Sequence, residues 1–159
     1  MREILRVLEQ DGRATPQAIA TMVGKPVAEV KKAIKAAEDS KAIVKYKAVV
    51  NWDKVGDEHV WALIEVRLTP QRGVGFDATA ERIYRFPEAR FVYLLSGTYD
   101  LAVIVVGTTM QEVASFVSSK LATLDGVQGT VTHFLLKRYK EDGVILADGE
   151  TLKRLPIAP

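Results

Sequence analysis

A lysine-rich stretch near the N-terminus is the first group of side chains whose types and spacing predict a chemistry. Seven lysines lie between residues 25 and 47, against three acidic side chains. A cluster of this charge is the expected footprint of a polyanion-binding surface, although a plain solvated helix face has the same composition. We predict that DNA phosphates and base edges are contacted by Ala28, Lys31, Lys32, Lys35, Lys45 and Lys47.

A Gly-Thr-Tyr-Asp sequence at residues 97–100 is the second group. Gly97 lets the backbone approach a ligand, and the amides of a turn suit a carboxylate. Asp100 can accept a hydrogen bond from an ammonium group, while Thr130 and Thr132 add hydroxyls from a strand predicted to be adjacent. These residues are candidates for a small-molecule site, formed by Gly97, Thr98, Tyr99, Asp100, Thr130 and Thr132. The alternative is an ordinary hairpin turn in which Asp100 bonds its own backbone.

The sequence offers little for catalysis or metal binding. It has no cysteine, which excludes disulfides, thiolate nucleophiles and cysteine zinc sites. Neither His59 nor His133 has an acidic cluster at ligand spacing. His133 and Arg138 are predicted on one strand but five residues apart, so they should face opposite sides of the sheet. We therefore expect no cofactor, no metal and no enzymatic activity.

The residues around the lysine-rich stretch predict three helices. The first covers about residues 3–11. Thr15 caps the second, and Pro16 fits its first position because the missing amide has no partner there. Gly24 ends it, as the residue that best adopts a left-handed turn. The third helix runs over about residues 26–40.

The spacing of Ala20, Gly24 and Val30 is typical of helix-turn-helix DNA-binding units. A small residue lies where the two helices cross, glycine makes the turn, and the aliphatic residue faces the core. With Val30 directed inward, a period of 3.6 residues turns Lys32 and Lys35 outward. The third helix is therefore predicted to be the recognition helix.

The pattern changes after the helices. Residues 42–51, AIVKYKAVVN, alternate enough to predict a strand or a short wing pair. Later segments predict the order β-α-β-β-α-β of a ferredoxin-like domain. Its strands are expected at residues 60–68, 89–96, 99–107 and 127–140, with a helix that Asp77 caps and another over residues 110–124.

One face of such a sheet carries two helices and the other is bare, so apolar residues on the bare face predict a dimer. We expect Trp52 and Trp61 to anchor a core or an interface. Beyond the last strand, Val144–Leu146 and an Asp148-Gly149 turn predict a small strand at a sheet edge or a contact with a neighbouring subunit.

The expected class is α+β, with a winged helix-turn-helix followed by a ferredoxin-like ligand-binding and dimerisation domain. We predict a DNA-binding domain at residues 1–50, a polar hinge at 51–58, the ferredoxin-like domain at 59–142 and a C-terminal tail at 143–159. Acidic residues interrupt the apolar pattern at the N-terminus, and no apolar run is long enough to span a bilayer. These features favour a cytoplasmic protein without a membrane partner.

Several motifs in order resemble the Lrp/AsnC family of transcription regulators over nearly the full length. They are the N-terminal helix-turn-helix block, Leu-Ser-Gly-Thr-Tyr-Asp-Leu at residues 95–101, and Leu-Asp-Gly-Val at 124–127 followed by Thr130 and Thr132. The resemblance implies homodimers that often assemble into octamers. It also implies an amino acid or related metabolite as the effector, bound between C-terminal domains.

The recognition helix departs from the family pattern, which has early Ser and Thr and later arginines. This chain has Glu29, which would repel phosphate, and lysines that lack the bidentate fork of arginine. A sensor or partner subunit that has lost specific DNA binding therefore stays open as an alternative. A second alternative, raised by the shared architecture alone, is an enzyme similar to the sirohaem decarboxylases.

Overall fold

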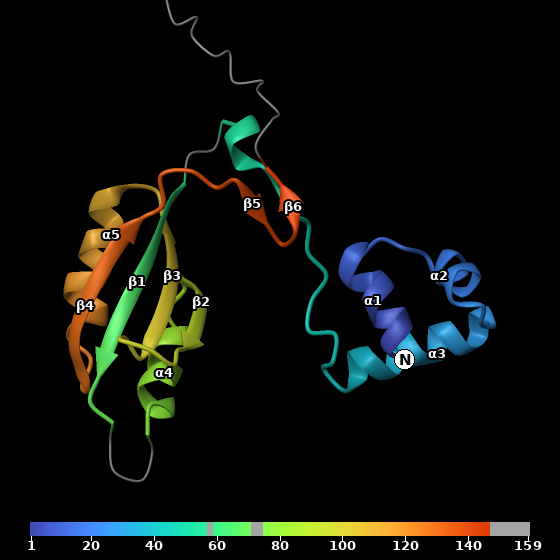
Figure 1. The fold of residues 1–159 in the computed structure, drawn as a ribbon, viewed down its shortest axis with the longest axis horizontal. Coiled ribbons are helices and arrows are strands. Elements are labelled where there is room, and N and C mark those ends of the chain that lie inside the picture. Colours follow the sequence, from blue (N-terminus) through green and yellow to red (C-terminus); the bar gives the residue numbers. More distant parts are fainter. Residues whose placement is uncertain (57–58, 71–74, 147–159) are drawn as a thin grey trace, which may run out of the picture. The chain divides into compact units, whose positions relative to one another are not determined.

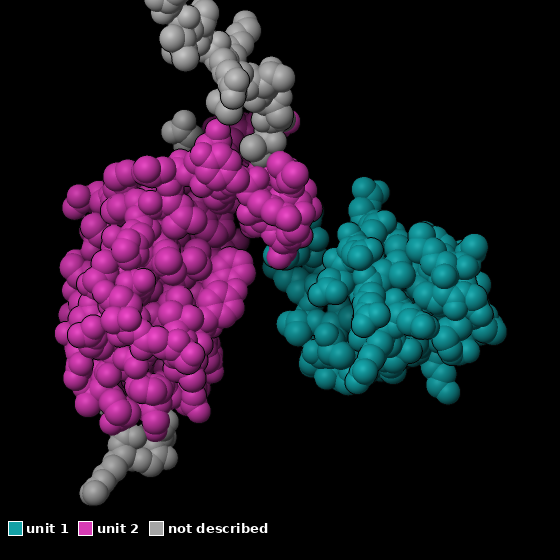
Figure 2. Space-filling model, in the orientation of Figure 1, with its two compact units in different colours: residues 1–50 teal, residues 51–159 magenta. Residues whose placement is uncertain are grey.

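The computed structural model describes residues 1–56, 59–70 and 75–146. The chain forms two compact units, residues 1–50 and 51–159, which are described separately below (Figure 2). The expected Asp148-Gly149 turn lies outside the described residues, as does part of the hinge.

Unit 1 is a bundle of three helices, α1 (Arg2–Gln10), α2 (Pro16–Val23) and α3 (Val27–Asp39) (Figure 1). Thr15 caps α2 as predicted, because its hydroxyl accepts a hydrogen bond from the Ala18 amide at 3.2 Å. Gly24 ends α2 with φ at 64°, the left-handed conformation that glycine adopts without strain. The core of the bundle is made by Ile4, Leu8, Ile19, Ala20 and Val30. The predicted helix-turn-helix packing is confirmed.

The strand or wing pair expected at residues 42–51 is wrong for this chain. Residues 44–51 have no strand pairing. The backbone amide of Ile43 donates to the Ala37 carbonyl, and the Tyr46 hydroxyl donates to the Glu38 carboxylate at 3.0 Å. These bonds hold the segment against the last turn of α3. A strand needs a hydrogen-bonded partner, and the described residues of unit 1 supply none.

Unit 2 has the predicted ferredoxin-like topology. Its four-stranded antiparallel sheet has the order β2-β3-β1-β4 (Figure 1). The strands are β1 (Val60–Leu68), β2 (Ala89–Leu94), β3 (Leu101–Gly107) and β4 (Val127–Phe134). The helices are α4 (Asp77–Tyr84) and α5 (Met110–Phe116), and α5 continues as a π-helical turn, η2 (Val117–Leu121).

Several predictions for unit 2 need correction, including the strand ends expected at residues 96 and 99, which lie at Leu94 and Leu101. Asp77 is the first residue of α4 and does not cap it. Strand β4 ends at Phe134 rather than near residue 140, because its partner β1 begins at Val60. The apolar tail does not extend the main sheet. Instead, β5 (Lys140–Glu141) and β6 (Val144–Ile145) form a separate hairpin.

The sheet buries one face only. Alternate residues of β1 from Ala62 to Leu68 join α4 and α5 in the core, with buried residues such as Ile83 and Phe116. Neither α4 nor α5 covers the opposite side. We call it the bare sheet face, and by strand register it consists of Trp61, Leu63, Glu65, Arg67, Phe91, Tyr93, Ala102, Ile104, Val106, Val131 and His133. Among the described residues, no helix has the length and apolar character needed to cross a membrane.

Candidate DNA-binding and effector sites

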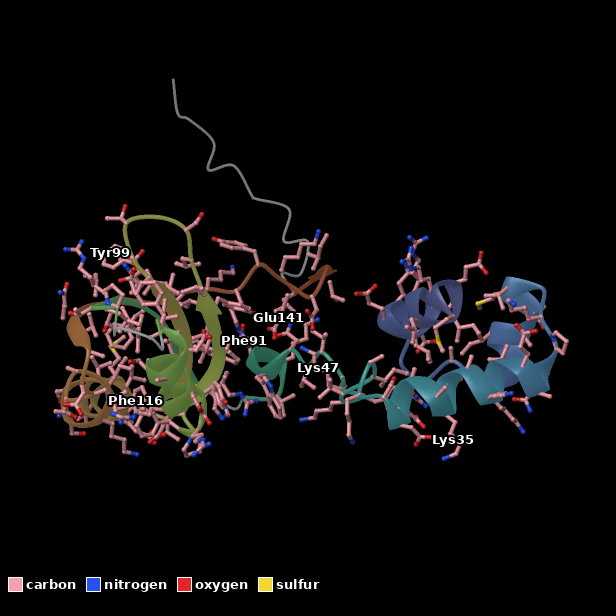
Figure 3. The ribbon with its side chains drawn as sticks, turned by 90° about the horizontal axis from the view of Figure 1, so that it is seen from below. Lys35, Lys47, Phe91, Tyr99, Phe116 and Glu141 are labelled. Carbon is pink, nitrogen blue, oxygen red and sulfur yellow. The ribbon has the colours of Figure 1, made fainter. Side chains whose placement is uncertain are left out.

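The outer side of α3 presents the side chains that the helical period predicted. Val30 and Ala37 are buried in the bundle. Ala28, Lys31, Lys32 and Lys35 are exposed, and Figure 3 shows Lys35 projecting away from the helix. The predicted orientation of α3 is confirmed, while its contacts with DNA stay a prediction.

Two ion pairs modify the charge of this helix. Lys25 donates a hydrogen bond to Glu29, and Lys35 lies 3.5 Å from Asp39. The hydrogen bond from Lys25 is the main cause that lowers the pKa of Glu29, and the same contact raises the pKa of Lys25. Glu29 is therefore held ionised but compensated, which reduces the phosphate repulsion expected from sequence. The i,i+4 spacing of the pair is the signal that could have revealed it.

Lys45 and Lys47 are exposed on the segment that follows α3. This segment and α1 line a groove of about 580 Å³, to which Arg2 and Arg6 also contribute. These two arginines were absent from the sequence-based set. The sequence shows that Arg2 and Arg6 share one face of α1. It does not show that the segment after α3 lies close to them.

Asp100 has a structural function in the predicted effector turn. Its carboxylate accepts a hydrogen bond from the Leu68 amide at 2.7 Å, and its own amide donates to Val66 at 3.0 Å. Asp100 thus ties the turn between β2 and β3 to the end of β1, where the pairing of β1 with β4 shifts register. The alternative expectation, that Asp100 bonds the backbone of its own turn, was correct in that Asp100 bonds backbone. The amide that it accepts from belongs to Leu68 on β1 and not to the turn.

Arg67 is a residue of this region that the sequence did not single out. Its guanidinium lies 5.6 Å from the centre of the Tyr99 ring, within the range of a cation–π contact. Gly97 and Thr98, which precede Tyr99 in the turn, are exposed. The turn therefore carries an aromatic ring next to a permanent cation.

The two predicted threonines are not brought to the turn. Thr130 and Thr132 lie on β4, and β1 separates β4 from β3. Two strand spacings amount to about 10 Å. The threonines pair with Val66 and Ile64, whose side chains face the helices. The expectation of an adjacent strand is therefore wrong within one chain, because β1 pairs with both β3 and β4 and lies between them.

The remaining candidate residues are also separated. Arg138 lies beyond the end of β4, so it does not share a strand with His133 as predicted. His133 lies 3.5 Å from Glu65 on the bare sheet face. Within residues 1–56, 59–70 and 75–146, no group of three or more His, Cys, Asp or Glu side chains could hold a metal ion.

A helix-turn-helix unit with an exposed lysine face, followed by a ferredoxin-like unit, defines a DNA-binding regulator of two domains. The sequence profile described as winged helix-turn-helix DNA-binding matches residues 1–44. The profile of the Lrp/AsnC ligand-binding domain matches residues 61–145. The chain belongs to the Lrp/AsnC family, and it is a transcriptional regulator with a DNA-binding and a ligand-binding domain.

Individual relatives agree with this assignment. The chain is 52% identical to the HTH-type transcriptional regulator YugG of Bacillus subtilis, over 99% of this chain and 95% of that protein. The structure of a transcriptional regulator from Neisseria meningitidis, in complex with L-methionine, is 25% identical with a TM-score of 0.70 and covers 87% of this chain and 89% of that one. A feast or famine regulatory protein from Mycobacterium tuberculosis, also in complex with L-methionine, shares the fold with a TM-score of 0.71 at 22% identity, covering 92% and 96%.

Proposed function

We propose that this regulator binds DNA with α3 in the major groove and with its flanking lysines on the phosphates. The observation that carries this proposal is the division of α3 into a buried face with Val30 and an exposed face with Lys31, Lys32 and Lys35. Lysines supply charge to phosphates and can donate to guanine, but they lack a bidentate fork. We therefore expect modest sequence discrimination from each unit.

The second part of the proposal is an amino-acid effector at the turn of residues 97–100. The relatives from N. meningitidis and M. tuberculosis in complex with L-methionine support this ligand class. Arg67 and the turn amides suit the carboxylate of an amino acid. A carboxylate accepts more than one hydrogen bond, so Asp100 can hold Leu68 and still receive an ammonium group. Thr130 and Thr132 could contribute only through another subunit or a displaced turn.

The third part is a homodimer through the bare sheet face. Phe91 and Tyr93 are exposed there with their rings stacked at 6.1 Å, beside the half-buried Leu63 and Ile104. An apolar sheet face without a cover is the surface that a second copy can bury. We propose that such dimers place two α3 helices on DNA in the cytoplasm, assemble further toward an octamer, and carry out no catalysis.

One observation favours a second candidate, a sensor or partner subunit without specific DNA binding. The thirteen residues of α3, VAEVKKAIKAAED, contain no arginine, serine, asparagine or glutamine to read bases. The experiment below separates the two functions.

The test is a titration of the full chain against labelled duplexes from the region upstream of its own gene, at two salt concentrations. The variant Lys32→Ala/Lys35→Ala should lose about 10- to 100-fold in affinity, because each lysine lost removes a phosphate contact and its counterion release. The slope of log affinity against log salt should fall by about two for each unit. The control Arg85→Ala/Arg90→Ala removes the same charge from unit 2 and should bind as the wild type does. Equal binding by both variants would exclude α3 as the DNA-binding face.

The Lys25–Glu29 pair leads to a gain-of-binding prediction. Glu29→Gln removes a negative charge beside the proposed groove and releases Lys25 for a phosphate, so DNA affinity should rise about two- to fivefold at low salt. The salt slope should become steeper by about one for each unit. Glu81→Gln, on an exposed pair of unit 2, is the matched control. A loss of affinity in Glu29→Gln would mean instead that Glu29 contacts a base.

A further inference from the structure

Three distant segments of unit 2 meet around one arginine. They are the beginning of the expected hinge, the beginning of β1 and the hairpin of β5 and β6. We call this group the Arg138 cluster, and it consists of Asn51, Asp53, Trp61, Arg138, Glu141 and Leu146.

The guanidinium of Arg138 contacts three side chains of this cluster. It lies 4.9 Å from the centre of the Trp61 ring, 2.9 Å from the Glu141 carboxylate and 4.0 Å from that of Asp53. Only 13% of the Arg138 side chain is exposed, whereas the lysine and arginine of the surface pairs Lys35–Asp39 and Arg85–Glu81 are 76% and 71% exposed. Cation–π and ionic contacts strengthen when water is excluded, so the contacts of Arg138 with Trp61 and Glu141 are firmer than a surface pair, whereas the Asp53 side chain is 70% exposed and its contact is the weakest of the three.

A second contact fixes the same part of the chain. The side-chain amide of Asn51 donates a hydrogen bond to the Leu146 carbonyl at 2.9 Å, and Leu146 is buried. Residues 52–54 then form a short 3₁₀ helix, in which the Val55 amide donates to Trp52 at 2.9 Å. The described part of the hinge is therefore anchored to the ligand-binding unit from its first residue.

We propose that Arg138 is a positioning residue that fixes where the linker leaves the ligand-binding unit, and so sets the separation of DNA half-sites that a dimer can bind. This inference rests on the proposed function, because it needs a dimer with two DNA-binding units. An extended chain gains at most about 3.5 Å per residue, so release of residues 51–56 would lengthen each linker by up to about 20 Å. A longer linker lowers the effective concentration of the second unit at its half-site and admits more separations.

The test selects binding sites from a pool of duplexes with random sequence, using the full chain, and reads the separation of half-sites by sequencing. The wild type should enrich one dominant separation. Arg138→Gln keeps a polar, unbranched side chain but shortens it and removes the charge, so its distribution of separations should broaden. Its affinity for the best wild-type duplex should fall about tenfold, whereas affinity for a duplex with one half-site should be unchanged. Arg90→Gln, on the exposed side of β2, is the matched control.

Two further measurements separate positioning from a loss of folding. Amide hydrogen exchange in residues 51–56 should quicken about tenfold or more in Arg138→Gln and stay unchanged in the sheet. Asn51→Ala, which removes the other anchor without touching the Trp61 contact, should broaden the separations in the same direction.

The outcomes distinguish this inference from the proposed function. If the wild type enriches no sites at all, the proposed DNA binding fails. If the wild type enriches one separation and both Arg138→Gln and Asn51→Ala enrich the same one, the linker is not positioned by this cluster and the inference is overturned. A wild type that already tolerates many separations would overturn it as well.

Discussion

Replacing Leu63 by aspartate is expected to separate the proposed dimer into monomers and to raise its dissociation constant at least about a thousandfold. Leu63 lies on β1, a central strand between β3 and β4. It is paired with Ile104 on β3 and with His133 on β4. In the proposed interface each protomer would bury one unpaired carboxylate. Burial of the two carboxylates costs about 2 kcal/mol or more for each charge. The dissociation constant should therefore rise about a thousandfold, since about 1.4 kcal/mol corresponds to a factor of ten.

The consequence for DNA should be as large. Loss of the dimer uncouples the two DNA-binding units, and linked binding commonly gains about 10²- to 10⁴-fold over a single unit. Leu63→Asp should therefore bind a two-site duplex no better than a one-site duplex. Sedimentation equilibrium measures the assembly and a fluorescence titration measures the binding.

The matched control for Leu63→Asp is Leu94→Asp. Leu94 is 60% exposed at the end of β2, and its register with Leu101 places it away from the bare sheet face. This control should remain dimeric. A Leu63→Asp protein that is also dimeric at nanomolar concentration would show that another surface holds the subunits together.

The elements of unit 1 could be predicted because their signals are local. Thr15, Pro16 and Gly24 act within one turn of the helix ends that they define, and the period of α3 places its lysines without knowledge of the rest of the chain. The strand expected at residues 42–51 failed because alternation indicates a chain suited to a sheet. It does not indicate whether another strand is available.

The candidate sites could be predicted only in part, because their contacts join residues far apart in sequence. Asp100 was selected correctly as a turn residue, but the amide that it holds lies 32 residues earlier. Asn51 and Leu146 are 95 residues apart, and no local pattern indicates that they bond. Arg67 was overlooked and Arg138 was considered only as a partner of His133, because an isolated arginine carries no signal until the fold supplies its aromatic neighbour.

The two functions assigned to Asp100 can be separated by a pair of variants. Asp100→Ala leaves the backbone amide of Leu68, a buried core residue, without its acceptor. The free energy of unfolding should therefore fall by about 1–3 kcal/mol. Asp100→Asn retains an oxygen acceptor and should recover most of this loss, but it removes the negative charge that an ammonium group requires. Its affinity for L-methionine should therefore fall about tenfold or more.

Both measurements are accessible in the full chain. Trp52 and Trp61 are its only tryptophans and both belong to unit 2, so their fluorescence in denaturant reports the unfolding of the ligand-binding unit. Calorimetry with L-methionine gives the affinity. Asp125→Asn changes an aspartate whose side chain is 86% exposed, and it should stay within about 0.5 kcal/mol of the wild type.

The combination of the two variants decides between the functions of the turn. If Asp100→Asn recovers stability and loses L-methionine, Asp100 both builds the turn and binds the effector. If it recovers stability and binds L-methionine as the wild type does, the carboxylate serves only the Leu68 amide, and the ammonium group must be recognised elsewhere. Because Asp100→Ala removes both functions at once, only the asparagine variant can show that the charge, and not the hydrogen bond to β1, selects an amino acid.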